Sequence, residues 1–437
     1  MTGFETRPPD WLSVGEALAR VIRRVTPLET ERVSVQESLG RALAAPVVAQ
    51  ATLPPWDNSA MDGYAVRHRD LLGASPASPK NLRVVGKLKA GDPEGPVLGE
   101  GEAVRIMTGA PLPSGADAVV RVEDTDAEAD PGIVWISLSP EAGKDIRPGG
   151  QDMRAGENLL PAGTTVGPGQ IGLLAASGTE GVLVRRRPRV AVLSNGNEIA
   201  PSAEFHRVKA GQAIPETNAP TLSAAVRAAG CIPLHLGIAK DTKESILDKV
   251  RLARELKADT LLTSGGASMG EFDLVKRVLD GEGLDLDFWR VKMRPGTPFS
   301  FGHLPNGTRT PLPVFGLPGN PASSFVTFQV FVRPFLLGMA GHARNHRPVV
   351  SAEVGEALRS PHWLTHFFRV LLTGAPSRPI AILTGSQTSG LVRSQGLASG
   401  LAVVPEGVQE LGVGQGVRVI LLDDFGIGGG EPGYLEG

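Results

Sequence analysis

The sequence predicts a multidomain α/β plus β protein. Its centre is a doubly wound, mostly parallel α/β domain, joined to a β-rich insertion domain, a C-terminal β domain and an N-terminal helical/linker domain. Three observations carry this prediction: a length of 437 residues, 55 glycines with 36 prolines, and alternating strand-like and helix-like patterns after Arg189. A single hydrophobic core rarely reaches this length. Frequent glycine and proline indicate many turns between short strands.

Composition and charge exclude several classes of protein. The formal net charge is -2, so we expect neither a general nucleic-acid binder nor a binder of anionic membranes, because both need a basic excess. Cys231 is the only cysteine, which rules out an intrachain disulfide, and its apolar run CIPLHLGI favours a buried residue. The N-terminus lacks a signal pattern, and no apolar run approaches membrane-spanning length. We therefore expect a cytoplasmic protein.

The chain divides into segments with different sequence patterns. Ser13 and Glu16 match a capping box before apolar residues at helical spacing, and Pro27 ends that helix. Short apolar runs between Gly, Pro and Asp then indicate a β module, after which loop and short helix rejoin the N-terminal segment. The expected domains are the linker domain at 1–50 and 143–184, the β-rich domain at 51–142, the α/β domain at 185–342, the C-terminal β domain at 343–425 and a flexible tail at 426–437.

The α/β domain has the clearest pattern. RVAVLSNGNE, which begins at Arg189, CIPLHLGI and DTLLTSGG are apolar runs typical of buried strands. Between the first two, Asn218 is expected to be the N-cap of a helix that Gly230 ends. A second helix is expected over residues 244–256. Strands and helices that alternate at this spacing predict parallel βαβ units, with helices on both faces of the sheet.

Polar loops at 194–198, 263–273 and 316–324 follow predicted strands, at the sheet edge where doubly wound proteins bind ligands. The second loop has paired glycines, whose backbone N–H groups suit a phosphate or oxyanion, and an acid that could reach a bridging metal. An ordinary glycine-rich turn explains it equally well. In the third loop Pro321 follows a possible cap, Asn320, so free N–H groups would face the cleft, although plain helix capping is the commoner explanation.

The segment WRVKMRPGTPFSFG carries cations at alternating positions, Arg290, Lys292 and Arg294. In a strand these side chains would share one face and repel one another unless an anion lay opposite. A solvated edge strand is the alternative, but beside two candidate anion loops we favour an anion site. The scattered histidines match no zinc pattern. The residues alone therefore predict an anion- or nucleotide-binding α/β enzyme with acidic loops such as PPWDNSAMDGYAV.

Taken together, the motifs resemble one family. DNSAMDGYAV, RIMTGAPLP, TSGGASMGEFD, MRPGTPF and GLPGNPAS stand in the order found in the molybdopterin molybdenumtransferases, the family of bacterial MoeA and the E domain of gephyrin-like proteins. The resemblance runs from about Ser13 to about Asp423. It implies an elongated, four-domain homodimer that inserts molybdate into adenylylated molybdopterin and releases AMP. It also implies a cleft in which the α/β domain of one subunit faces the β domain of the other.

The resemblance also implies which residues act. Asp62 is one of these residues, and a structural role in a turn is an alternative interpretation for it, since Asp-Gly is a common hairpin pair. We expect Asp241 and Asp273 to hold Mg²⁺, because carboxylate oxygens suit a hard divalent ion, and the cations near Arg290 to attract molybdate. The functional polar positions are Asp62, Thr108, Asp152, Glu198, Asp241 and Asp273. The cofactor-binding positions are Gly265, Gly266, Ser268, Gly270, Arg290, Lys292, Arg294, Pro318, Gly319, Asn320, Pro321 and Arg369.

Four positions depart from the family pattern. Thr297 stands where many relatives carry lysine, Asn197 and Gln151 replace acids, and Ser399 stands where asparagine is common. The partners implied are a second copy of the chain, the molybdopterin adenylyltransferase and acceptor molybdoenzymes. Three alternatives stay open: a relative that only adenylylates molybdopterin, a nucleotide hydrolase on the same α/β domain, and a non-enzymatic gephyrin-like scaffold. The intact acidic loops weigh against the scaffold.

Overall fold

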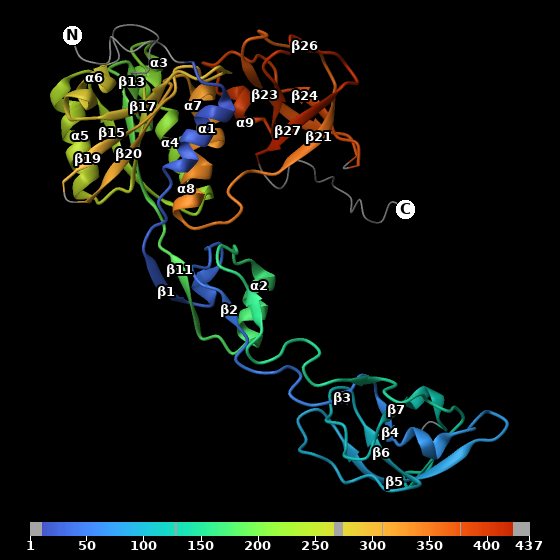
Figure 1. Cartoon of the computed structure of the whole chain (residues 1–437). Coiled ribbons are helices and arrows are strands. Elements are labelled where there is room, and N and C mark those ends of the chain that lie inside the picture. The colour runs from blue at the N-terminus through green and yellow to red at the C-terminus, as the bar shows by residue number, and fades with distance from the viewer. Residues whose placement is uncertain (1–10, 127–128, 266–273, 308, 376, 423–437) are drawn as a thin grey trace.

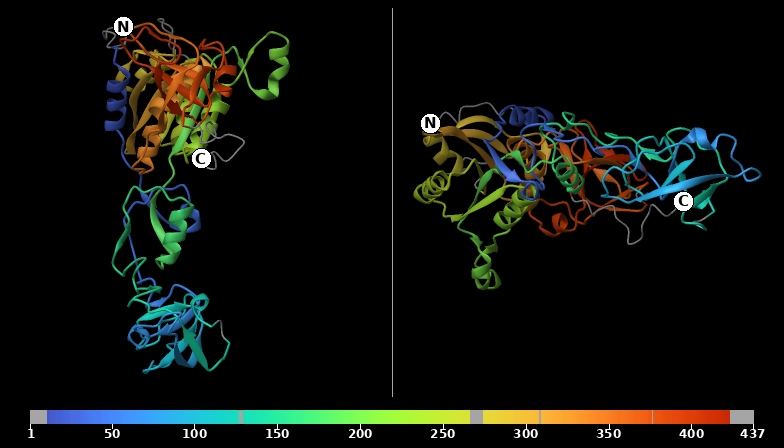
Figure 2. Two further views of the ribbon diagram at one scale, coloured as in Figure 1. Left: turned by 90° about the vertical axis from the view of Figure 1, so that its right-hand side faces the viewer. Right: turned by 90° about the horizontal axis from the view of Figure 1, so that it is seen from below.

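The computed structural model describes residues 11–126, 129–265, 274–307, 309–375 and 377–422. These residues form an elongated molecule with two packed parts at one end, a small middle part and a β-rich part at the far end (Figure 1). A view turned by 90° about the vertical axis gives the same order of parts (Figure 2, left). The expected flexible tail at 426–437 and the expected site residues Gly266, Ser268, Gly270 and Asp273 lie outside the described residues.

A six-stranded sheet lies at the centre of the largest part. Its strand order is β15-β12-β16-β20-β19-β17. The first four strands are parallel, which confirms the predicted βαβ pattern, and β19 pairs antiparallel with both β20 and β17. The chain passes from β12 to one neighbour and then to the other, so the order reverses between β12 and β16. The strand bounds are β12 Arg189–Asn195, β15 Ile232–Ala239, β16 Thr260–Ser264, β17 Asp285–Trp289, β19 Ser300–Asn306 and β20 Arg309–Leu317.

Helices cover both faces of this sheet. One face packs against α1, α4 and the run α7-η5-α8 in an aromatic core, and the other packs against α5 and α6. The predicted capping box is present at the start of α1, where Ser13 Oγ accepts the Glu16 N–H at 3.2 Å. Cys231 is 5% exposed, and burial raises the pKa of its thiol to about 12. The helix bounds are α1 Val14–Arg23, α4 Asn218–Ala228, α5 Lys243–Glu255, α6 Leu274–Gly281, α7 Pro321–Thr327, η5 Phe328–Val332 and α8 Arg333–Met339.

One long apolar helix corrects an expectation from the sequence. Pro321–Met339 is long and apolar enough to cross a membrane by length and composition, whereas no apolar run of that size was expected. However, 78% of its most apolar window is buried inside the protein. Phe328 and Phe331 on this helix have 0% exposure. These are the features of a core helix, which is apolar because other elements surround it.

The C-terminal part is a small closed barrel. Strands β23, β24, β21, β27 and β25 pair in a ring, since β25 returns to β23, and β18 adds parallel to β23. Because β18 precedes β19 in the chain, it joins the barrel to the α/β part. The bounds are β18 Met293–Arg294, β21 Val349–Val354, β22 Leu358–Arg359, β23 Thr365–Thr373, β24 Ile380–Leu383, α9 Arg393–Gly396, β25 Gly400–Val404, β26 Glu410–Leu411 and β27 Gly416–Leu421.

Two distant chain segments build the middle part. Strand β1 pairs with β11 and β2 pairs with β10, so the N-terminal segment meets the segment that follows the β module. Helix α2 packs beside them, with Leu174 fully buried in their shared core. The bounds are β1 Thr30–Ser34, η1 Gln36–Ser38, β2 Val47–Val48, β10 Asn158–Leu160, α2 Pro168–Ala176 and β11 Gly181–Arg185.

The far β-rich part contains a five-stranded sheet in the order β7-β4-β6-β5-β8, beside the short pair β3-β9. A separate small arm projects from the α/β part between β13 and β14 and carries α3 (Figure 2). The bounds are β3 Asn58–Ser59, β4 Gly63–Val66, η2 His68–Leu71, β5 Lys80–Leu88, β6 Glu102–Ile106, β7 Ala118–Arg121, η3 Val122–Asp124, β8 Ile133–Ile136, β9 Ile146–Arg147, β13 Ile199–Ala200, η4 Ser202–Glu204, α3 Phe205–Lys209 and β14 Ile214–Pro215.

Candidate active site

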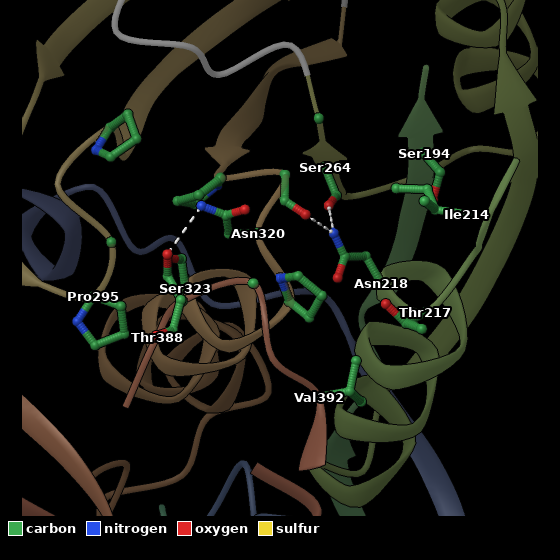
Figure 3. Close-up of a pocket in the computed structure, with 18 of the residues that line it drawn as sticks. Ser194, Ile214, Thr217, Asn218, Ser264, Pro295, Asn320, Ser323, Thr388 and Val392 are labelled. Carbon is green, nitrogen blue, oxygen red and sulfur yellow. Dashed lines mark hydrogen bonds between the residues drawn. The ribbon is translucent and has the colours of Figure 1, made fainter. Parts of the chain in front are cut away.

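A cleft opens beyond the carboxyl ends of β12 and β16, between the α/β part and the barrel (Figure 3). Its volume is about 990 Å³. The ends of the two strands form one wall, the loop before α7 lies at the centre, and residues 293–298 and 387–390 form the wall toward the barrel. The strand order reverses at this point, which is where doubly wound sheets bind ligands. The structure thus places the cleft at the predicted edge.

Two glycines bring the loops after β16 and β20 together. Gly265 has a φ of +100°, in the left-handed region that favours glycine, and a Cβ there would lie 2.3 Å from the carbonyl oxygen of Asn195. A Cβ on Gly319 would lie 3.4 Å from the Cα of Gly265. Both glycines line the cleft. Larger residues at position 265 would therefore push β16 away from β12.

The start of α7 is fastened to the barrel. Asn320 is the N-cap and Pro321 is the first helical residue, as predicted, but the Asn320 side chain makes no capping bond. Its Nδ2 instead donates to Ser389 Oγ at 3.0 Å, and the N–H of Ala322 donates to the Ser389 carbonyl at 3.0 Å. The residues of this region that line the cleft are Pro318, Asn320, Pro321 and Ser389. One loop of the barrel is thereby tied to the central loop of the cleft.

Asn218 does not have the role that the sequence predicts. Helix α4 begins at Asn218 with Thr217 in the N-cap position, and no side chain caps it. The Asn218 Nδ2 donates to Ser264 Oγ at 2.7 Å and to the Gly319 carbonyl at 2.6 Å (Figure 3). The predicted N-cap is wrong, because Ser264 and the Gly319 carbonyl take both N–H groups of the amide. Sequence reasoning missed Asn218 as a cleft residue, since an Asn before a helix has the same signal as a cap.

The acidic residues of the α/β part lie at two neighbouring strand ends. Asp241, just after β15, accepts from Asn195 Nδ2 at 2.7 Å and from the Asn197 N–H at 3.0 Å. Glu198 lines the cleft. Within the ranges that the structure describes, no group of three or more His, Cys, Asp or Glu could hold a metal ion. Both Asp241 oxygens keep further lone pairs, so this carboxylate fits an ion that prefers oxygen.

The three predicted cations do not share one face. Strand β17 ends before Arg290, whose φ of 76° turns the chain, and β18 then joins the barrel sheet. The Arg290 guanidinium lies 4.0 Å from the centre of the Trp289 ring, and Lys292 pairs with Glu406 at 3.1 Å. Of the three, Arg294 alone lines the cleft. The prediction of a single cationic strand is wrong, because a left-handed residue breaks the alternation.

A buried cation lies behind the barrel wall of the cleft. Arg369, on β23, has 0% exposure. Its Nε donates to Ser394 Oγ at 3.2 Å and its Nη2 to the Thr388 carbonyl at 3.4 Å, while Nη1 has no hydrogen-bond partner among the described residues. Burial, and then the charge of Arg294, lowers the pKa of Arg369 to about 10, so the guanidinium stays charged at pH 7. A buried charge without an acid partner is costly, but it makes this wall attractive to anions.

The positions that depart from the family pattern have ordinary structural partners. Thr297 lines the cleft and its hydroxyl donates to the Met293 carbonyl at 2.7 Å. Ser399 is 5% exposed, and its Oγ accepts the Leu372 N–H at 2.9 Å. Gln151 is exposed in the segment that connects the middle and β-rich parts. Asn197 contributes its backbone N–H to Asp241, as described above.

Asp62 and Thr108 meet in the β-rich part. The Asp62 Oδ1 accepts from the Thr108 N–H at 2.7 Å and from its hydroxyl at 2.8 Å. These two bonds, the backbone one first, lower the pKa of Asp62, so the carboxylate is ionised at neutral pH. Asp152 lies in the connecting segment, where its N–H donates to the Leu53 carbonyl at 3.0 Å. This part is at the opposite end of the chain's fold from the cleft (Figure 1). One chain therefore does not bring these residues to the cleft.

His366 makes the stability of the barrel depend on pH. It is 3% exposed, it stacks on Phe368 with ring centroids 3.7 Å apart, and neither ring nitrogen has a partner within the described residues. Burial, and then the charges of Arg294 and Arg369, lowers its pKa from 6.5 to about 3. The unfolded chain therefore binds a proton below pH 6.5 that the folded chain excludes. The contribution of His366 to the free energy of unfolding is fully present above pH 6.5 and is lost as the pH drops toward 3.

Replacing this histidine is expected to flatten the acid dependence of stability. Between pH 6 and pH 4, His366→Phe should lose less free energy of unfolding than the wild type, by about 1 kcal/mol per pH unit. Urea unfolding at several pH values measures the difference. The exposed His346 provides a control, since His346→Phe should keep the wild-type acid dependence. Parallel curves for His366→Phe and wild type would contradict this account.

The fold and the cleft define a class: multidomain proteins with a cleft where a doubly wound sheet meets a β-barrel. The sequence matches the MoeA N-terminal region (domain I and II) over residues 12–178, a probable molybdopterin binding domain over residues 191–338 and the MoeA C-terminal region (domain IV) over residues 351–422. The chain belongs to the molybdopterin molybdenumtransferase (MoeA) family, as the sequence motifs indicate.

Relatives of similar length support this membership. The chain is 36% identical over 397 residues to the molybdopterin molybdenumtransferase of Nostoc sp., covering 90% of this chain and 89% of the relative. It is 34% identical over 421 residues to that of Bacillus subtilis, covering 96% and 95%. Two solved structures of molybdopterin biosynthesis MoeA protein from Pyrococcus horikoshii are similar. One has a TM-score of 0.76 at 32% identity, covering 95% of this chain and 100% of that chain. The other has 0.82 at 25% identity, covering 94% and 100%.

Proposed function

We propose that the protein inserts molybdate into adenylylated molybdopterin, with release of AMP and formation of molybdenum cofactor. One observation supports this above others: a chain that matches molybdopterin molybdenumtransferases over 90% of its length has a cleft with an anion-attracting wall. That wall carries Arg294 at its surface and Arg369 behind it. The opposite wall carries the glycine-built edge of the parallel sheet. A substrate with phosphate groups at one end and a metal-binding dithiolene at the other matches these two walls.

The cationic wall is the place for molybdate. Arg294 is exposed in the cleft, where its planar guanidinium can offer two parallel N–H groups to an oxyanion. The charge of Arg369 acts on the anion through the barrel loop. The low-dielectric protein between the guanidinium and the cleft screens this charge only weakly. Together the two cations offset the charge of molybdate beside an anionic dithiolene. Arg290 and Lys292 contribute less in this proposal, since they stack on Trp289 and pair with Glu406.

The acids and glycines act on the phosphoanhydride. In the reaction the bond between AMP and the pterin phosphate breaks, water supplies the oxygen and AMP leaves. The backbone after β16 holds phosphate, and Glu198 orients water or substrate. Asp241 and Asp273 hold Mg²⁺, and Asn195 and Asn197 fix the Asp241 carboxylate for this role. When bound, the ion offsets the charge that develops as the anhydride breaks.

The complete site needs two copies of the chain. We place Asp62, Thr108 and Asp152 of one subunit opposite the cleft of the other, in a cytoplasmic homodimer. Asp62 and Thr108 lie in the β-rich part, Asp152 lies in the segment that connects it to the middle part, and the β-rich part is at the far end of the elongated fold, away from the cleft of the same chain (Figure 1). The Thr108 bonds keep Asp62 ionised and oriented. The adenylyltransferase that supplies the substrate and the molybdoenzymes that accept the product are the further partners.

A reconstitution tests the function directly. Purified protein is incubated with adenylylated molybdopterin, Mg²⁺ and molybdate, while AMP release and activation of an apo-molybdoenzyme are followed. Molybdate-dependent AMP release with activation is the expected result. AMP release that does not depend on molybdate would indicate the nucleotide hydrolase instead. Absence of both reactions would contradict the enzyme and favour the scaffold.

A further inference from the structure

A series of hydrogen bonds crosses the cleft from the barrel to the parallel sheet. Arg369 Nη2 donates to the Thr388 carbonyl, and the next residue, Ser389, accepts from Asn320 Nδ2. Asn320 is adjacent to Gly319, whose carbonyl accepts from Asn218 Nδ2. The same nitrogen donates to Ser264 at the end of β16. The central loop is therefore held from both sides, by an asparagine in each case.

The orientation of the Asn218 amide is dictated by its partners. The Gly319 carbonyl can only accept, so the nitrogen of the amide, not the oxygen, must face it at 2.6 Å. The 2.7 Å bond to Ser264 Oγ then uses the second N–H. The serine hydroxyl, which accepts from Asn218, keeps its own hydrogen for another acceptor. Asn218 thus joins the end of β16 to the loop after β20.

The two loops need such a tie. Gly265 and Gly319 have no side chains to interlock, and their backbones approach until a Cβ on Gly319 would be 3.4 Å from the Gly265 Cα. Backbone groups that bind one ligand from two separate loops lose affinity when the loops move independently, because binding must then order them. Asn218 comes from a third element, the start of α4, and holds both loops at once.

We propose that Asn218 is a positioning residue that sets the spacing between the end of β16, at Ser264 and Gly265, and Gly319 after β20, for the nucleotide end of the substrate. This inference rests on the proposed function. The nucleotide end is favoured because Asn218 lies on the sheet side of the cleft with Ser264 and Ser194, while Pro295 and Thr388 lie on the other side (Figure 3). The cation Arg294, which precedes Pro295, belongs to that other side. Loss of Asn218 should therefore weaken nucleotide binding and leave molybdate binding intact.

The test compares three substitutions by calorimetry with AMP and by steady-state kinetics. Asn218→Ala removes both bonds and is expected to weaken AMP binding about 10-fold. Asn218→Asp keeps the size but replaces the donors by a carboxylate facing a carbonyl, so its loss should exceed that of alanine. Ser264→Ala keeps the Gly319 bond and should lie between wild type and Asn218→Ala. Arg227→Ala, exposed on the same helix, is the control that should bind AMP normally.

The outcomes separate positioning from loss of structure. Partial unfolding would lower kcat and leave both KM values unchanged, whereas a positioning role raises the KM for adenylylated molybdopterin and leaves that for molybdate. Equal AMP affinity in wild type and Asn218→Ala, or wild-type affinity in Asn218→Asp, would overturn the inference while molybdate-dependent turnover still upheld the function. If the variants bind AMP more weakly but wild-type turnover does not depend on molybdate, the proposed function is rejected and the inference about Asn218 stands. If Asn218→Ala does not fold, Ser264→Ala decides.

Discussion

Mixing two inactive variants, Asp62→Asn and Arg294→Glu, is expected to restore about a quarter of the wild-type activity. In the proposed homodimer each site combines the β-rich part of one chain with the cleft of the other. A mixed dimer has one site with both substitutions and one site with neither. When subunits exchange freely, half of the dimers are mixed and each has one intact site of two, which gives about a quarter.

Each substitution alone should lower molybdate-dependent AMP release by about 100-fold or more, because a charged group at the reacting centre is lost or reversed. Folding should survive in both. Asp62 and Arg294 are exposed, and Asn at position 62 can still accept the Thr108 bonds through its Oδ1. Activity after mixing, together with a tag-based count of mixed dimers, makes the measurement.

A matched pair supplies the control. Asp62→Asn mixed with Thr108→Ala places both substitutions in the β-rich part, so every site in a mixed dimer has one defect and activity should not return. Mixed dimers of Asp62→Asn and Arg294→Glu without activity would contradict the shared site. Full activity in a protein that remains monomeric would contradict it as well.

Arg369→Met is expected to stabilise the fold and to raise the KM for molybdate at least about 10-fold. Replacing a buried charge by an apolar side chain of similar volume is often neutral or stabilising, and Nη1 of Arg369 has no partner within the described part of the chain. The same change removes half of the cationic pair that attracts the oxyanion. Urea unfolding and molybdate titration of the initial rate measure the two effects.

Stability and molybdate use should therefore change in opposite directions at this position. Arg344→Met, an exposed replacement of the same type, should alter neither property. A lower stability in Arg369→Met would indicate that its bonds to Ser394 and Thr388 outweigh the cost of burial. An unchanged molybdate KM would remove Arg369 from the proposed wall.

The α/β core was predictable because its signals are local. The apolar run from Arg189 and the run CIPLHLGI form the parallel strands β12 and β15, since strands covered on both faces need continuous apolar sequence. The capping box at Ser13 is equally local. The position of the cleft followed from topology, because loops after neighbouring parallel strands meet at one edge.

Other features were not predictable from the pattern, for physical reasons that differ. The left-handed backbone at Arg290 breaks a cationic alternation that looks like a strand. Asn218 has the sequence position of a cap, and only the tertiary approach of Gly319 gives its amide a different partner. The closure of the barrel depends on β25 returning to β23, a pairing between distant segments. The separation of Asp62 from the cleft of its own chain was implied by the family resemblance, and no local pattern indicated it.

The connection to the β-rich part consists of two neighbouring chain segments, where Leu53 and Met153 share a backbone bond of 2.9 Å and Gly150 donates to the Pro54 carbonyl at 2.8 Å. Such a narrow joint acts as the pivot of a lever whose far end carries Asp62. A small rotation at the pivot displaces that carboxylate through a much larger arc. Since a misplacement of about 1 Å can cost about 100-fold in rate, the stiffness of this joint would govern how well the two chains of the proposed homodimer align their shared chemistry.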